Sequence, residues 1–148
     1  MSAPGTQEQR FDEPRLSAAF SHEITAATDD IDELGHVSNL VYLRWVLDIA
    51  MAHSSSAGWD YARYVREGAV FVVREHHVTY LAPAFAGERL RVTTWIASWR
   101  GASSERRTRI ERVADSRELA QARTLWVLVS TDATRPRRIP AELVAAFT

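Results

Sequence analysis

The chain has 148 residues, which suits a single domain built around one hydrophobic core. Its 46% hydrophobic and 25% charged residues are typical of a globular protein, and a net charge of −1 gives no general attraction for nucleic acid or anionic membranes. Cysteine is absent and all 18 basic residues are arginines, which excludes a disulfide scaffold, a thiolate nucleophile and a Schiff-base lysine. Because no signal peptide or membrane-spanning run is evident, we expect a cytoplasmic protein that binds neither membranes nor nucleic acid.

The N-terminal part of the sequence predicts a tail, a strand and an acidic loop. Residues 1–16 are polar and lack an apolar period, so we expect a mobile tail in front of a single domain at 17–148. Residues 20–28 resemble a short strand. Four acids follow within five positions, and Ser38 then fits the N-cap of a helix that begins at Asn39.

The predicted helix is apolar almost all round, which is typical of a buried helix. One stripe contains Leu40, Leu43, Leu47 and Ala50, and only the i,i+4 pair Arg44 and Asp48 interrupts the pattern. Residues 59–68 predict a second, shorter helix that ends at Gly68.

The second half of the chain predicts four long strands, at 69–81, 88–99, 103–113 and 119–131, followed by a last helical turn at 141–147. Their connections are short enough for an antiparallel meander. One sheet covered on one face by one buried helix is an α+β fold. Because such a sheet leaves open edges, we expect a homodimer or a tetramer.

Asp32 is the first candidate for chemistry. Its carboxylate precedes a helix whose unpaired N–H groups carry positive partial charge and can hold an oxyanion. The alternative is that Asp29, Asp30, Asp32 and Glu33 are solvated turn residues.

Three other residues near this helix have two interpretations each. His36 either assists a proton transfer or is a hydrogen-bonded part of the loop, and Asn39 either donates to substrate or satisfies a nearby carbonyl. Asp48 is either a site residue or the partner of Arg44 within a buried helix.

Two further clusters have simpler explanations. His76 and His77 are adjacent in a strand, so their side chains point to opposite faces and cannot share a metal ion. The arginines that could bind phosphates are Arg100, Arg106, Arg107, Arg109, Arg112, Arg135, Arg137 and Arg138. Within residues 103–113, however, Glu105 and Glu111 alternate with the arginines, which favours a salt-bridged strand surface.

The segment DIDELGHVSNLVYLRWVLDIA, residues 30–50, resembles the signature of the 4-hydroxybenzoyl-CoA thioesterase branch of the hotdog superfamily. It is also similar to the plant acyl-ACP thioesterase loop, D-x-D-x-x-x-H-V-[NS]-N followed by Y-x-x-W. Residues 78–96 and 98–107 resemble later strands of the family, and the likeness covers about residues 20 to 140.

The resemblance implies a hotdog fold, a thioester of coenzyme A or acyl carrier protein as substrate, and neither a metal nor a separate cofactor. Asp32 matches the catalytic carboxylate, as nucleophile or general base, and His36 matches the histidine of the plant-type loop. The backbone N–H near Asn39 matches the oxyanion donor. Predicted substrate-binding residues are Tyr42, Asp48 and Arg100, and we expect an apolar acyl tunnel to open beside Asp32.

One departure from the family pattern concerns Leu34, which stands where the plant-type loop has an asparagine. The leading function is therefore hydrolysis of an acyl thioester by Asp32 without that helper. A hotdog protein that only binds acyl thioesters is the alternative, and a hydratase is disfavoured because it should show its acid and histidine on the central helix in a different arrangement, which this sequence does not.

Overall fold

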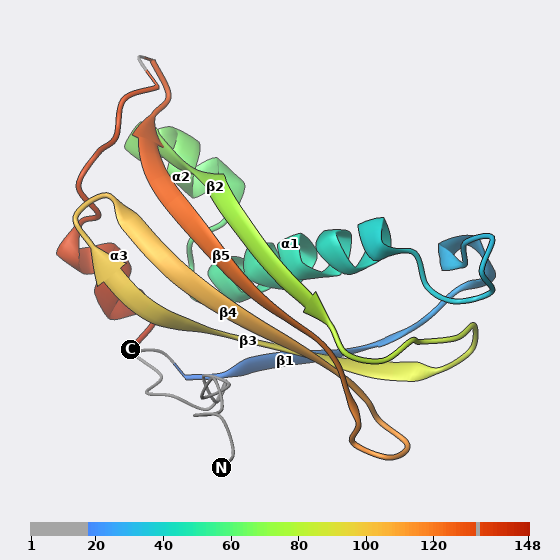
Figure 1. Ribbon diagram of the computed structural model, residues 1–148. Coiled ribbons are helices and arrows are strands. Elements are labelled where there is room, and N and C mark those ends of the chain that lie inside the picture. The colour runs from blue at the N-terminus through green and yellow to red at the C-terminus, as the bar shows by residue number, and fades with distance from the viewer. Residues whose placement is uncertain (1–17, 133) are drawn as a thin grey trace, which may run out of the picture.

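The structure is a computed structural model that describes residues 18–132 and 134–148. Five antiparallel strands form one sheet, and the long helix α1 lies across one face of it (Figure 1). The predicted mobile tail at 1–16 lies outside the described residues. The elements are β1 (Phe20–Thr25), a 3₁₀ turn (Thr28–Asp30), α1 (Asn39–Ser56), α2 (Tyr61–Glu67), β2 (Ala69–Tyr80), β3 (Arg89–Arg100), β4 (Ser103–Arg112), β5 (Glu118–Ser130) and α3 (Ala141–Ala146). The predicted α+β class is confirmed.

The strand order in the sheet is β1-β3-β4-β5-β2. Strands β3, β4 and β5 form the expected meander, but the prediction that β2 pairs with β3 is wrong, since β2 pairs with β5 at the far edge. The segment between β2 and β3 makes no hairpin because it packs against the approach to α1, where the N–H of Val37 donates to the carbonyl of Ala84 at 2.8 Å. Strands β1 and β2 are left as the two edges.

Helix α1 begins as predicted, with the Ser38 side chain accepting the N–H of Leu40. Its buried stripe, however, is not the predicted one, because only the positions that face the sheet are covered. The buried residues are Tyr42, Trp45, Val46, Ile49, Ala50 and His53. Leu40 is 76% exposed, and Met51 and Asp48 also face solvent. No helix in the described parts of the chain is both long and apolar enough to cross a membrane.

Two hydrophobic clusters occupy the two ends of α1. Tyr42, Trp45 and Ile49 pack with Leu90 and Ile110 near the start of the helix. The second cluster lies beyond its end and contains residues of α2, α3 and the adjoining strands, namely Trp59, Tyr64, Ala69, Ile96, Leu128, Ile139, Leu143 and Phe147. The core therefore has two parts, one at each end of α1, and a site belongs to one end or the other.

A β-bulge in β3 decides which side chains face the second cluster. The register with β4 shifts between Ile96 and Ser98, so Trp99 rather than Ser98 shares a face with Leu90, Val92 and Ile96. Trp99 pairs with Ser104 on β4, and Ser104 pairs with Trp126 on β5. These three side chains therefore form a row across the sheet on the side of α1.

Candidate functional site

The acidic loop is a tight hairpin that ends immediately before α1. Ile31 and Val37 form an antiparallel bridge at its base, and the N–H of Asp32 donates to the carbonyl of His36 at 2.9 Å. The turn closes where the N–H of Gly35 donates to the carbonyl of Asp32 at 3.1 Å. Gly35 has φ +84°, a conformation that other residues rarely adopt. The hairpin thus sets Asp32 and His36 opposite each other.

The Asp32 carboxylate is partly accessible and held at one oxygen only. Its Oδ1 accepts the N–H of Leu34 at 2.9 Å and lies 3.9 Å from Nδ1 of His36, which is beyond hydrogen-bond range. Within residues 18–132 and 134–148 no partner is recorded for Oδ2. The Leu34 side chain is 78% exposed, so its backbone, and not its side chain, supports the carboxylate.

The start of α1 leaves one backbone donor without a recorded partner. Ser38 accepts from Leu40 through its side chain, and from Val41 and Tyr42 through its carbonyl. No bond from the N–H of Asn39 is found in the described chain. The carbonyl of Asn39 accepts the Tyr80 hydroxyl at 3.2 Å, and its side chain is exposed. A free N–H at a helix N-terminus can bind a developing negative charge.

Asp30 anchors the loop to the helix. Its carboxylate accepts the N–H of Ala27 at 2.9 Å and the Arg44 guanidinium at 2.9 Å, and the residue is 8% exposed. The predicted pair of Arg44 with Asp48 is therefore wrong. Asp48 is exposed on the outer face of α1, so burial does not require it to be paired.

The predicted substrate-binding residues do not lie together, since only Tyr42 among them packs in the cluster that includes Ile31 and Val37 of the Asp32 hairpin. Tyr42 is 3% exposed and packs edge-on against Trp45 and Tyr80, and burial raises the pKa of its phenol. Arg100 ends β3, whereas the other end of that strand, Arg89, pairs with the strand that leads into the loop. Arg100 is therefore at the far end of the sheet from Asp32 within one chain.

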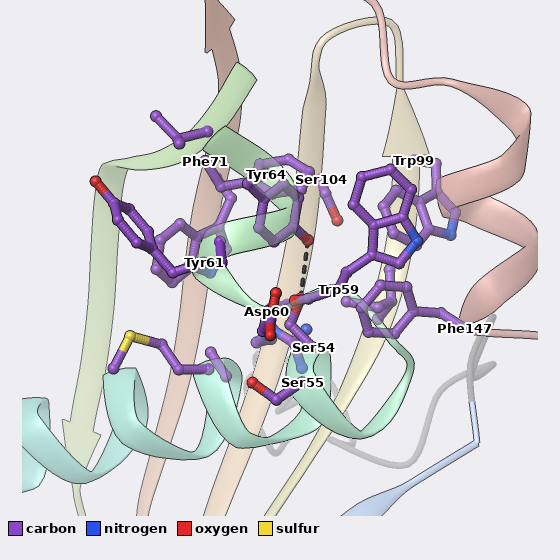
Figure 2. A pocket seen from close by; sticks show the side chains of 17 residues that line it. Ser54, Ser55, Trp59, Asp60, Tyr61, Tyr64, Phe71, Trp99, Ser104 and Phe147 are labelled. Atoms are coloured by element: carbon purple, nitrogen blue, oxygen red, sulfur yellow. Dashed lines mark hydrogen bonds between the residues drawn. The ribbon is translucent and has the colours of Figure 1, made fainter. Parts of the chain in front are cut away.

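The main cavity also lies far from Asp32. It has a volume of about 680 Å³ and opens between the last turns of α1, helix α2, the sheet and Phe147 (Figure 2). None of the predicted site residues lines it. Since a helix rises about 1.5 Å per residue, the length of α1 separates the loop from this cavity by roughly 20 Å. Asp32 does not line this cavity, and the expectation that an acyl tunnel opens beside Asp32 stays a prediction.

Seven of the residues that line the cavity are aromatic. Figure 2 shows Trp99 and Phe147 on one side and Tyr61 and Phe71 on the other. Between them, the hydroxyls of Ser54 and Tyr64 lie 2.8 Å apart, and Ser54 also donates to the carbonyl of Trp59 at 2.6 Å.

Arg106 lines the same cavity and is 5% exposed. Its Nη1 donates to Nδ1 of His53 at 2.8 Å and to Oγ1 of Thr94 at 3.1 Å. Burial, together with the charge of Arg106, lowers the pKa of His53 to about 4, so the imidazole is neutral. Burial lowers the pKa of Arg106 to about 10, which leaves the guanidinium charged at neutral pH.

Sequence reasoning grouped Arg106 with surface arginines and missed this role. The neighbouring arginines on β4 do form the expected salt-bridged surface: Arg107 pairs with Glu105 and Arg109 with Glu111, each at 3.2 Å. The signal was the alternation Ser104, Arg106, Thr108 and Ile110, which places Arg106 on the apolar face of the strand. The described chain holds no group of three His, Asp or Glu side chains arranged to bind a metal.

Comparison with known proteins agrees with this geometry. A five-stranded antiparallel sheet with a long helix across one face is the hotdog fold. Residues 26–147 match the family model of the thioesterase-like superfamily, and the chain belongs to that family.

One relative is the acyl-CoA thioester hydrolase YbgC of Escherichia coli, which is 38% identical over 81 residues, or 55% of this chain. The match spans 60% of the length of that curated relative.

Two solved structures share the fold. A 1,4-dihydroxy-2-naphthoyl-CoA thioesterase from Synechocystis has a TM-score of 0.81 at 20% identity, covering 88% of this chain and 96% of that one. A 4-hydroxybenzoyl-CoA thioesterase variant in complex with 4-hydroxybenzoyl-CoA has a TM-score of 0.80 at 21% identity, covering 88% and 99%.

Proposed function

We propose that this protein hydrolyses acyl thioesters of coenzyme A or of acyl carrier protein, with Asp32 as the catalytic carboxylate. The observation that carries the proposal is a half-exposed carboxylate, held at Oδ1 by the Leu34 N–H, beside the N-terminus of the central helix. The thioesterase-like family and the hydrolase relatives support the reaction class.

The chemistry has two routes from the same geometry. As a nucleophile, Asp32 forms a C–O bond to the thioester carbon, the C–S bond breaks, and water hydrolyses the resulting anhydride to release the acid. As a general base, Asp32 takes a proton from water, which attacks the carbonyl, and the thiolate leaves and is protonated. In both routes the N–H of Asn39 stabilises the oxyanion, and His36 assists proton transfer from its place across the hairpin.

We further propose a homodimer, or a tetramer of such dimers, in which the edge strand β2 pairs with its copy. Phe71, near the start of β2, lines the cavity, and Tyr80, at its end, binds the carbonyl of Asn39. Antiparallel pairing about a twofold axis brings the Tyr80 end of one copy beside the Phe71 end of the other. Exposed Val72 and Met51 supply apolar surface for such contact. The dimer would join the carboxylate of one chain to the cavity of its partner.

The test is thiol release from short, long and aromatic acyl-CoAs, and from acyl carrier protein thioesters, by wild type and Asp32→Asn in parallel. We expect turnover of some thioester and a loss in kcat on the order of 10²-fold or more in Asp32→Asn. Asp29→Asn is the matched control, because Asp29 is an exposed acid of the same loop.

Two outcomes contradict the proposal in different ways. Full activity in Asp32→Asn would move the catalytic role away from this carboxylate. Binding of every thioester without turnover by the wild type would identify a non-catalytic acyl-thioester-binding protein.

A further inference from the structure

The cavity at the end of α1 has buried hydrogen-bond donors without acceptors. Within the described chain, the Oγ of Ser104 and the indole Nε1 of Trp59, Trp99 and Trp126 are buried and have no hydrogen-bond partner. All four residues line the cavity, and Ser104 is 2% exposed. These four polar atoms are themselves buried in the cavity wall, so the residues line the space with their other atoms and the polarity of the cavity has to come from another side chain.

Arg106 supplies a full positive charge to the cavity. Its recorded partners, His53 and Thr94, are neutral, and no carboxylate of residues 18–132 or 134–148 forms an ion pair with it. A buried cation without an anion is costly, because the free energy of its lost hydration is not recovered. A neutral histidine that accepts one N–H orients the guanidinium without cancelling its charge.

The acceptors in the cavity are already used or lie at its rim. The hydroxyl of Ser54 is engaged with Tyr64 and with the Trp59 carbonyl. The Asp60 carboxylate is exposed and caps α2 by accepting the N–H of Arg63 at 2.8 Å. The interior therefore offers a cation and aromatic walls, and it lacks an anion.

We propose that this cavity binds the carboxylate of an apolar acid, with Arg106 as its ion partner and the aromatic walls around its apolar body. Its volume of about 680 Å³ suits a small organic ligand. Guanidinium and carboxylate are complementary in charge and in planar geometry, which makes carboxylate the preferred anion.

Two sources supply this chemistry. One is a free carboxylic acid. The other is an acyl thioester whose acyl chain ends in a second carboxylate, and this source alone rests on the proposed hydrolase function. It requires the cavity of one chain to serve the Asp32 of its partner.

The first arm of the test measures binding of decanoate and of decan-1-ol by titration calorimetry, which needs no turnover. We expect the wild type to bind decanoate more than about tenfold more tightly than the alcohol. Arg106→Met should remove that preference and keep the affinity for the alcohol, whereas Arg106→Lys should keep part of it. The matched control is Arg107→Met, because Arg107 lies on the opposite face of the same strand and pairs with Glu105.

Arg106→Lys guards against a folding failure of Arg106→Met, because it keeps a buried positive charge beside His53 and Thr94. Equal affinity of wild type for acid and alcohol, or an unchanged preference in folded Arg106→Met, would overturn the inference.

The second arm compares hydrolysis of suberoyl-CoA with that of octanoyl-CoA, which has the same chain length without the second carboxylate. A higher kcat/KM for suberoyl-CoA that reverses in Arg106→Met identifies the dicarboxylic acyl source. Decanoate binding without this selectivity identifies a free acid. The cavity inference alone is overturned if thioesters are turned over, decanoate does not bind and Arg106→Met has no effect. The proposed function alone is overturned if decanoate binds and no thioester is turned over.

Discussion

The two ends of helix α1 differ in how the core is filled and in where the polar groups lie. At its start, Tyr42, Trp45 and Ile49 close the core against the sheet, and the polar groups lie outside in the Asp32 hairpin. At its end, the core is not filled, and the guanidinium-bearing side chain of Arg106 lines an internal space. The start of α1 thus presents the Asp32 carboxylate to solvent, and its end buries the Arg106 guanidinium.

Under the proposed function, the fold separates two requirements of a hydrolase. A reactive carboxylate needs access and fixed orientation, which a hairpin beside a helix N-terminus provides. Selection of a substrate needs a shaped and dry space, which the gap under Phe147 provides. Because one helix length separates them, a second copy is the simplest way to bring them together.

The largest expected effect on stability belongs to the packed end. Leu90 is fully buried in the first cluster, so Leu90→Ala should lower the free energy of unfolding by about 2–5 kcal/mol. Urea denaturation measures this change. A loss below about 1 kcal/mol would show that this end is not closely packed.

Acid should destabilise the cavity end through His53. Its pKa is about 4 in the folded protein and 6.5 ordinarily, so the unfolded chain binds the proton more readily. The stabilisation from the neutral imidazole is complete above about pH 6.5 and is lost as the pH falls towards 4, by on the order of 3 kcal/mol. Urea denaturation between pH 6.5 and 5 should show this slope in wild type and a weaker one in His53→Gln. Equal slopes would refute the assignment.

Loss of Arg44, near the start of α1, should lower the free energy of unfolding moderately. Arg44→Met removes the partner of the mostly buried Asp30 and should cost about 1 kcal/mol. Asp48→Asn is the control and should change stability by less than about 0.5 kcal/mol, because Asp48 is exposed. A larger effect of Asp48→Asn would restore the sequence-based pairing of Arg44 with Asp48.

Ser104→Ala should have the smallest effect on stability. Because the Ser104 hydroxyl is buried without a partner, its removal should leave the unfolding free energy unchanged within about 0.5 kcal/mol or raise it slightly. Thermal and urea unfolding check this. A loss above about 1 kcal/mol would mean that the hydroxyl is already satisfied.

Local signals in the sequence predicted local structure well. The cap at Ser38 and the end of α2 at Gly68 were predicted correctly. These features depend on a few adjacent residues, whose side-chain chemistry is visible in the sequence.

Features that depend on distant partners were not predictable in the same way. The place of β2 beside β5 depends on non-local pairing, and the bond of Arg44 to Asp30 joins residues 14 apart. Arg106 was missed because charge alternation on β4 suggests a solvated strand, whereas the opposite face of that strand closes the cavity. The Asp32 hairpin was found through its motif, but its distance from the cavity follows only from the fold.

The most direct test of the account is subunit mixing, because it asks whether the two ends of α1 act together between copies. Asp32→Asn and the cavity-filling variant Ser104→Phe are each assayed for thioester hydrolysis alone and after being unfolded and refolded together. Each alone should be inactive, and an equal mixture should recover about a quarter of wild-type activity, since half of the dimers then contain one intact site. Mixed dimers that form, as seen by native mass spectrometry, but remain inactive would contradict the account.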